Sequence, residues 1–197
     1  MPRDGEKVRR SLQAAALELY AERGYEDVTA TEIAARAGVT ERTFFRHFPD
    51  KREVLFDGAS SLSLILTNAV HDAEATLSPW ATLLHAFHAA TPLLVENRRI
   101  SEPRRRIIAS SPALQERELT KMMSLTTTLA CALQGRGVPD KLASLAAQIG
   151  IAAFGQAFSC WLDGEPGELD DHLEQAFRDV HDVVIIPLNQ AAGYTGE

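Results

Sequence analysis

Apolar residues recur every three or four positions through most of the chain, which is the spacing of α-helices that bury one face. The first run covers residues 6–23 and stops at Gly24. Later runs of the same kind are expected over residues 79–97, 112–134, 139–162 and 168–186. No segment alternates between apolar and polar residues as a half-buried β-strand does. The pattern predicts an all-α protein with about nine helices.

Residues 29–55 hold two short helical runs that are separated by a glycine. Thr29 and Glu32 have the S/T-x-x-E spacing of a capping box, in which each side chain bonds the other residue's free backbone amide. Gly38 suits the left-handed end of the first helix, and Thr40 is a second N-cap. Two short helices joined by a tight turn are the geometry that places the second helix in a DNA major groove.

The second helix of this pair is expected from Thr40 to about Phe48. Phe44 and Phe48 are four residues apart and share a face, so they should anchor the helix to its own domain. Phe45 lies about 100° further round and should be partly exposed. The polar side chains of this helix are Glu41, Arg42, Thr43, Arg46 and His47.

A fourth helix is expected directly after this pair. Asp50 and Glu53 repeat the capping spacing, and the helix should run from about Lys51 to Leu77, roughly 40 Å at 1.5 Å per residue. Lys51 would then lie in a first helical turn, where a cation opposes the helix dipole. A phosphate opposite the ammonium would make that charge favourable, so a phosphate contact is expected.

Residues 8–56 resemble the DNA-binding domain of the TetR family of bacterial transcriptional regulators. The matching segments are G-x-x-x-x-T from Gly24, I-A-x-x-A-G-V-T from Ile33 and T-F-F-R-H-F-P-D-K-x-x-V-L from Thr43. One departure is Phe45, where the family usually has a tyrosine whose hydroxyl contacts phosphate. Phe45 cannot donate a hydrogen bond, so apolar contact with a sugar or a thymine methyl is expected there instead.

The resemblance implies a three-helix helix-turn-helix domain over residues 1–50. A C-terminal helical bundle over residues 51–189 would bind a ligand and form the dimer, and residues 190–197 are expected to be a disordered tail. A homodimer has a physical reason, because one small head buries too little surface to bind DNA tightly. Two heads spaced by a multiple of about 34–36 Å read a palindrome.

Contacts with DNA are expected from the two short helices and the turns beside them. Bases would be read by Glu41, Arg42 and Thr43, and by Thr31 of the first helix. Glu41 can accept a hydrogen bond from a cytosine amino group, and Arg42 can donate two to a guanine. The phosphate-contacting residues are expected to be Thr29, Thr40, His47 and Lys51.

The net charge of −7 is unusual for a protein that binds DNA. The charge is unevenly distributed, because residues 1–52 carry +1 and residues 53–197 carry −8. Attraction to phosphate depends on a local face rather than on the total charge. The acidic residues are therefore concentrated away from the expected DNA-binding segment.

Several protein classes find no support in the sequence. Cys131 and Cys160 are too few for a disulfide framework, and buried free thiols are expected, with a redox sensor as the alternative. No run of about 18 apolar residues predicts a membrane span, and the N-terminus lacks the apolar core of a signal peptide. A bacterial cytoplasmic location is expected. No G-x-S-x-G, HExxH or phosphate-loop motif indicates an enzyme.

The last two helices are the candidates for the dimer interface. The penultimate helix carries small residues that allow close helix approach, namely Ala146, Ala147, Gly150, Ala153, Gly155 and Ala157. The last helix is amphipathic. Pairing both across a two-fold axis would form a four-helix interface. The alternative is that both helices pack inside one subunit.

A small, mostly apolar effector is expected in the second domain. The candidate lining residues, each of which can equally be plain core, are Trp80, Leu83, Phe87, His88, Met122, Met123, Thr126, Phe154, Phe158 and Trp161. Residues 98–114 and the helices after them resemble regulators of the mycofactocin-type and acyl-CoA-responsive group, which implies an acyl or acyl-thioester ligand. Its carboxylate or phosphates would lie near some of Arg98, Arg99, Arg104, Arg105 and Arg106. The alternative is a solvated basic helix paired with acidic side chains.

His85 and His88 are three apart, but no third ligand completes a metal site, so neither a metal nor a cofactor is predicted. The sequence thus indicates a homodimeric, ligand-responsive transcriptional regulator that binds a DNA operator. Repressor rather than activator follows from the resemblance alone. A helical small-molecule carrier or enzyme without DNA binding is the alternative, but a carrier would not need the segment 29–55.

Overall fold

The computed structural model describes the backbone of residues 2–185 and the side chains of residues 5–183. The chain forms two compact units, each made of two separate segments. Unit 1 comprises residues 1–62 and 96–124, and unit 2 comprises residues 63–95 and 125–197. The predicted tail, residues 190–197, lies outside the described residues.

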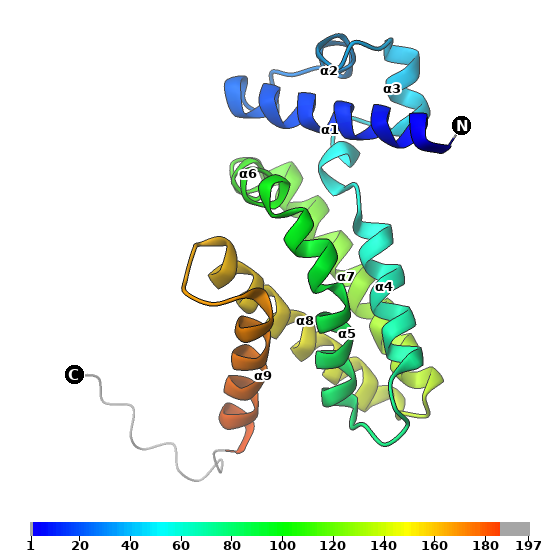
Figure 1. Cartoon of the computed structure of the whole chain (residues 1–197), viewed down its shortest axis with the longest axis vertical. Coiled ribbons are helices and arrows are strands. Elements are labelled where there is room, and N and C mark those ends of the chain that lie inside the picture. The colour runs from blue at the N-terminus through cyan, green and yellow to red at the C-terminus, as the bar shows by residue number, and fades with distance from the viewer. Residues whose placement is uncertain (1, 186–197) are drawn as a thin grey trace, which may run out of the picture. The chain divides into compact units, whose positions relative to one another are not determined.

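Every regular element in the described part of the chain is helical, which confirms the all-α prediction (Figure 1). In chain order the elements are α1 Pro2–Arg23, α2 Ala30–Arg36, α3 Glu41–His47, the 3₁₀ helix η1 Glu53–Phe56, α4 Ala59–Asp72, α5 Pro79–Glu96, α6 Arg98–Ala109, α7 Pro112–Gly135, α8 Asp140–Leu162 and α9 Leu169–Ile185. The helices α4, α5 and α7 contribute residues to both units.

The core of unit 1 gathers around the apolar stripe of α1. Leu12 and Ala16 on α1 are fully buried and belong to the same core cluster as Ile33 on α2 and Phe44 on α3. α1 ends where Gly24 adopts a φ of 85°, a conformation that a side chain disfavours. The predicted anchoring of the second short helix through Phe44 and Phe48 is confirmed, because both rings are buried.

The prediction of one long helix from Lys51 to Leu77 is wrong. The chain forms the short η1 and then restarts at α4, with Gly58 between them at a φ of 90°. The side chains of Val54, Leu55 and Phe56 on η1 all join the buried core of unit 1. The positive φ of Gly58 is not helical, so it separates η1 from α4.

The core of unit 2 is aromatic and is built by α5, α8 and α9. The rings of Phe87 and Phe154 stack with centroids 4.8 Å apart, and Trp80 lies 4.2 Å from Phe177. Gly150 on α8 is buried, and an added Cβ there would lie 2.9 Å from Leu83 Cδ1. The glycine therefore allows α5 and α8 to approach closely.

The helix α8 bears on the expectation that no segment spans a membrane. The helix α8 is long and apolar enough to cross a membrane by length and composition alone, although 44% of its apolar window is buried inside the fold. That criterion is weak evidence, since the core helix of a soluble protein meets it equally well.

The prediction of buried cysteines is wrong, because Cys131 is exposed on α7 and Cys160 is half-buried. Cys131 lies on the opposite side of α7 from the buried Leu129 and Leu133.

Candidate nucleic-acid interface

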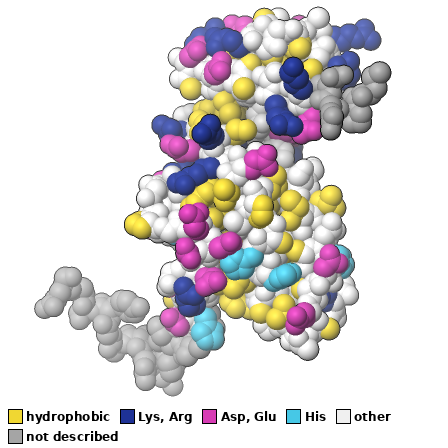
Figure 2. Space-filling view, viewed as in Figure 1, with side chains coloured by type: hydrophobic (Ala, Val, Ile, Leu, Met, Phe, Trp, Pro, Cys, Tyr) yellow, Lys and Arg dark blue, Asp and Glu magenta, His cyan; other side chains and the backbone are white. Residues whose placement is uncertain are grey.

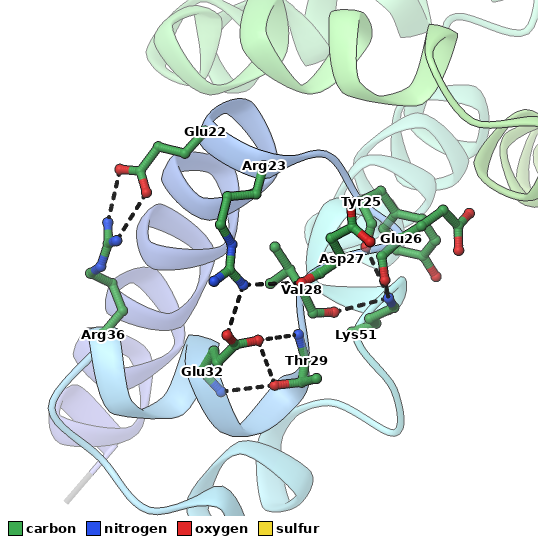
Figure 3. Close-up of polar contacts among 10 residues, drawn as sticks. All are labelled: Glu22, Arg23, Tyr25, Glu26, Asp27, Val28, Thr29, Glu32, Arg36 and Lys51. Carbon is green, nitrogen blue, oxygen red and sulfur yellow. Dashed lines mark hydrogen bonds and ion pairs between the residues drawn. The ribbon is translucent and has the colours of Figure 1, made fainter.

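The start of α2 is fixed by the capping box that the sequence predicts. Thr29 Oγ1 accepts a hydrogen bond from the Glu32 amide at 3.3 Å, and the Glu32 carboxylate accepts from the Thr29 amide at 2.9 Å (Figure 3). Arg23, the last residue of α1, donates to the same carboxylate at 2.8 Å. Hydrogen bonds from Thr29 and Arg23 lower the pKa of Glu32 to about 2. The carboxylate therefore stays charged and holds α2 against the end of α1.

The turn between α2 and α3 is closed by backbone bonds and a second cap. Gly38 has a φ of 70°, and the Val39 amide donates to the Ala34 carbonyl at 2.9 Å. Thr40 is the N-cap of α3, and its Oγ1 accepts from the Thr43 amide at 3.2 Å. Both short helices thus begin at the threonines that the sequence spacing identified.

The helix α3 has one buried and one exposed side. Phe44 is fully buried, whereas its neighbour Phe45 is 50% exposed, as predicted. Glu41 and Arg42 are exposed at the start of the helix, and Thr43 is half-buried. The predicted base-reading side chains therefore lie on the open face of α3, and Thr31 is exposed on α2.

Two of the predicted phosphate-contacting side chains, those of Thr29 and His47, are poorly placed to bind a phosphate. The Thr29 hydroxyl donates to Glu32 Oε2 at 2.7 Å, within the capping box. His47 Nε2 is buried and has no hydrogen-bond partner among the described residues. Burial lowers the pKa of His47, and the positive charges of Arg46 and Arg9 lower it further. A neutral imidazole with a buried Nε2 is poorly suited to holding a phosphate.

The geometry does not favour the predicted phosphate contact of Lys51 either. Its ammonium donates to three backbone carbonyls of the loop between α1 and α2, those of Tyr25, Glu26 and Val28 (Figure 3). Lys51 does not lie in a first helical turn, because it precedes η1.

Two residues of α1 also shape this region through partners that are distant in the sequence. Arg9 on α1 donates to Asp57 at 2.8 Å and lies over the Phe48 ring, with its guanidinium carbon 4.8 Å from the centroid. Tyr20 on α1 donates to the Lys51 carbonyl at 2.7 Å, and burial raises the pKa of the phenol. These partners are 48 and 31 residues apart. Spacing in the sequence therefore gives no signal for them.

Charges of both signs lie side by side on the molecular face shown in Figure 2. In unit 1, Arg36 of α2 pairs with Glu18 and Glu22 of α1 at 3.2 and 3.0 Å. The cation of Arg36 is thus committed to α1. Arg42 makes no ion pair among the described residues, so its charge is open to a partner.

The predicted effector-binding residues are divided between the two units. Leu83, Phe87, Phe154 and Trp161 are buried in the aromatic core of unit 2. Met122 and Met123 belong to unit 1, and Met123 is 71% exposed. The other four candidates, all in unit 2 and partly exposed, are Trp80, His88, Thr126 and Phe158.

His88 has a defined partner in unit 2. Its Nδ1 lies 2.6 Å from Asp170 Oδ1, and Thr91 donates to the same oxygen at 2.7 Å. This contact joins α5 to the first turn of α9. No group of three or more side chains suited to a metal ion occurs among the described residues.

Two arginines of α6, Arg104 and Arg106, make defined contacts within unit 1. Arg104 donates to the Leu55 carbonyl at 2.5 Å and to Glu118 at 3.2 Å, and it lies over the Phe56 ring. Burial lowers the pKa of this guanidinium, and the Glu118 carboxylate opposes that shift. Arg106 is exposed and pairs with Glu102 one turn earlier. Both contacts correspond to the alternative of a basic helix paired with acidic side chains.

The capped pair α2 and α3, with a polar open face on α3, defines the chain as a helix-turn-helix protein. The family model for bacterial regulatory proteins of the tetR family matches residues 12–57, and that for the MftR C-terminal domain matches residues 77–184. The second match covers more than half of the chain. The chain therefore belongs to the TetR family of transcriptional regulators, with an MftR-type C-terminal domain, and this is not a family of enzymes.

Individual relatives agree with this assignment. The chain is 25% identical over 178 residues to the putative mycofactocin biosynthesis transcriptional regulator MftR of Mycobacterium tuberculosis, covering 89% of each. It is 36% identical over 83 residues to the transcriptional regulator TcmR of Streptomyces glaucescens, which is 42% of this chain but only 37% of TcmR. The fold resembles that of Thermus thermophilus FadR, a TetR family repressor solved with lauroyl-CoA, at 23% identity and a TM-score of 0.57 over 94% of this chain and 99% of FadR.

Proposed function

We propose that this regulator binds a palindromic DNA operator as a homodimer and is released from it by a small, mostly apolar effector. The observation that carries the DNA-binding part is the division of α3 into a buried side at Phe44 and Phe48 and an open polar side at Glu41 and Arg42. A short helix held in this way can enter a major groove without disturbing its own core. Release by the effector makes the regulator a repressor.

The residues that we propose contact DNA have separate roles. Arg42 donates two hydrogen bonds to a guanine, and Glu41 accepts from a cytosine amino group. Phe45, half-exposed beside them, makes apolar contact with a sugar or a thymine methyl. Thr31 and Thr43 lie near the base edges and Thr40 near a phosphate.

Homodimer formation is supported by apolar side chains that unit 2 leaves exposed on α8 and α9. Leu142 and Leu145 on α8 are about half-exposed, and Val183 on α9 is 70% exposed. Of the six small residues expected at this interface only Gly155 is exposed, and the other five are buried inside the subunit, namely Ala146, Ala147, Gly150, Ala153 and Ala157. Packing these faces across a two-fold axis would cover the apolar surface and pair two reading heads.

The effector is proposed to be an acyl compound, an acyl-CoA or a related thioester. The support comes from the MftR-type C-terminal domain and from the likeness to FadR, which was solved with lauroyl-CoA. An effector releases DNA only through its differential affinity for the two conformations of the dimer. A cytoplasmic location follows from this role, because the operator lies on the chromosome.

A binding assay tests the proposal. The full-length protein is titrated onto a labelled duplex that covers the promoter of its own gene, over a series of salt concentrations, with a random duplex of equal length as the control. We expect tighter binding to the promoter duplex and a steep loss of affinity with salt. The Arg42→Ala variant should lose about 1–3 kcal/mol on the promoter duplex and relax the preference at one base pair.

Equal affinity of the wild-type protein for promoter and random duplexes would reject operator recognition. Native mass spectrometry of the purified protein measures the oligomeric state and any carried small molecule together. A monomer at micromolar concentration would reject the homodimer. Addition of lauroyl-CoA to the promoter complex tests the effector class, and unchanged binding at saturating concentration would reject an acyl thioester of that length.

A further inference from the structure

We infer that Lys51 is a positioning residue: its ammonium fixes the loop between α1 and α2, and thereby the start of α2, and does not contact a DNA phosphate. The inference rests on the proposed function only for its effect on DNA binding. The part that concerns the loop is tested on the free protein.

Every N–H of the Lys51 ammonium has an acceptor inside the protein. Nζ lies 2.9 Å from the Tyr25 carbonyl oxygen, 3.2 Å from that of Glu26 and 2.9 Å from that of Val28 (Figure 3). An ammonium group carries three donors, and here there are three acceptors. A phosphate could bind only by displacing one or more of these carbonyls.

Two aromatic side chains hold Lys51 in this position. Its Nζ lies 4.3 Å from the centroid of the Tyr25 ring, a distance that favours a cation–π contact. The hydroxyl of Tyr20 donates to the Lys51 backbone carbonyl at 2.7 Å, and the rings of Tyr20 and Tyr25 meet edge to face at 5.4 Å. Both the backbone and the side chain of Lys51 are therefore bound to α1 and the loop that follows it.

The loop needs these donors because α1 ends at Arg23 and α2 begins only at Ala30. Backbone carbonyls that leave a helix lose their partners, and those near a core are costly to leave unpaired. Arg23 donates to the Asp27 carbonyl at 3.1 Å, the one that Lys51 does not bind. All four consecutive carbonyls from residue 25 to residue 28 thus accept a hydrogen bond from a cationic side chain.

The position of this loop determines where α2 starts. The Val28 carbonyl, which Lys51 binds, immediately precedes Thr29, the N-cap of α2. The Val28 side chain is fully buried, so the loop is held from the core on one side and by the ammonium on the other. Loss of the ammonium should make the loop more mobile. The orientation of α2, against which α3 packs, should then be less well defined.

The two roles of Lys51 predict different effects of its loss on the salt dependence of DNA binding. A lost phosphate contact lowers the slope of log affinity against log salt by about 0.9 for each contact, or about 1.8 for a dimer with two heads. A lost positioning residue lowers the affinity at every salt concentration and leaves the slope unchanged. For Lys51→Met, we expect affinity for the promoter duplex to fall roughly tenfold at unchanged slope.

The loop itself is tested without DNA. Lys51→Met should lower the thermal midpoint by about 5 °C and speed amide hydrogen exchange in residues 24–29. Lys141→Met is the matched control, because Lys141 is exposed at the start of α8. The control should leave the midpoint and the exchange of the loop unchanged. A Lys51→Met protein with the wild-type midpoint and loop exchange would overturn the inference.

A measurement on the wild-type protein covers the case in which Lys51→Met does not fold. The chain has four lysines, and reductive methylation of the free protein followed by peptide mass spectrometry reports their relative reactivity. The bound ammonium of Lys51 should react at least tenfold more slowly than Lys141. Equal reactivity would overturn the inference, because a lysine that waits for a phosphate is open to reagent until DNA is added.

These outcomes separate the inference from the proposed function. Slow methylation of Lys51 and a fall in the midpoint support the positioning role even if the wild-type protein binds no promoter DNA. Tight promoter binding with a slope that drops in Lys51→Met rejects the positioning role while the proposed function stands.

Discussion

The short helices of unit 1 and the long helices of unit 2 are stabilised in different ways. The helices α2 and α3 have seven residues each, a length that is not stable as an isolated helix in water. Side-chain caps fix the starts of both helices, and Arg23 and Lys51 bind the loop that precedes α2. The helices α8 and α9 have 23 and 17 residues and are held by buried apolar side chains.

Hydrogen bonds and apolar burial differ in what they contribute to short and to long helices. Hydrogen bonds to caps and carbonyls are directional, so they set the orientation of elements too short to be set by packing. Apolar burial is not directional but accumulates with area, so it suits long helices. Substitutions of the polar side chains in unit 1 should therefore alter both the orientation of the short helices and stability, whereas substitutions in the apolar cores should act mainly on stability.

The largest expected effect comes from a core residue of the head. Phe44→Ala removes a fully buried ring and should lower the free energy of unfolding by about 3–5 kcal/mol, measured by urea denaturation. The neighbouring Phe45→Ala is the control, because Phe45 is half-exposed and its loss should change stability by less than about 0.5 kcal/mol. Phe45→Ala should nevertheless weaken promoter binding. Similar unfolding free energies for the two variants would contradict the division of α3 into a buried and an open side.

A smaller effect tests whether polar bonds also stabilise unit 2. Arg136, in the turn before α8, donates to four carbonyls at the end of α4, those of residues 70, 71, 73 and 74, at 2.7–3.5 Å. Arg136→Met should cost about 2–3 kcal/mol in urea denaturation, because these carbonyls lose a charged donor. Arg178→Met, which breaks only an exposed pair with Glu174, should cost less than about 0.5 kcal/mol. Equal costs would show that the α4 carbonyls do not depend on Arg136.

The smallest effect is a pH dependence in the capping box of α2. The pKa of Glu32 is lowered from its ordinary value of 4.5 to about 2 in the folded protein. A depressed folded pKa adds stability that is fully present above the unfolded pKa and is lost as the pH falls from about 4.5 towards 2. Glu32→Gln removes this contribution. We expect the thermal midpoints of wild type and Glu32→Gln to converge over that range, and a constant difference would contradict the assignment.

The sequence by itself determined the features that depend on residues close together in the chain. The helical periods, the capping box of Thr29 and Glu32, the Thr40 cap and the buried and open sides of α3 were all predicted, because each involves residues within about one helical turn. The TetR-like order of these residues also indicated the class of protein.

Only the tertiary structure decided what depends on distant partners. The bonds of the Lys51 ammonium are one case, because its acceptors lie 23 to 26 residues earlier in the chain. The expected long fourth helix is divided at Gly58, and η1 before it packs Val54, Leu55 and Phe56 into the core around α1. Arg104 lies in an arginine-rich segment that resembled a ligand site, and its partners are Leu55, 49 residues away, and Glu118. A charged side chain has several stable partners in principle, and packing selects among them.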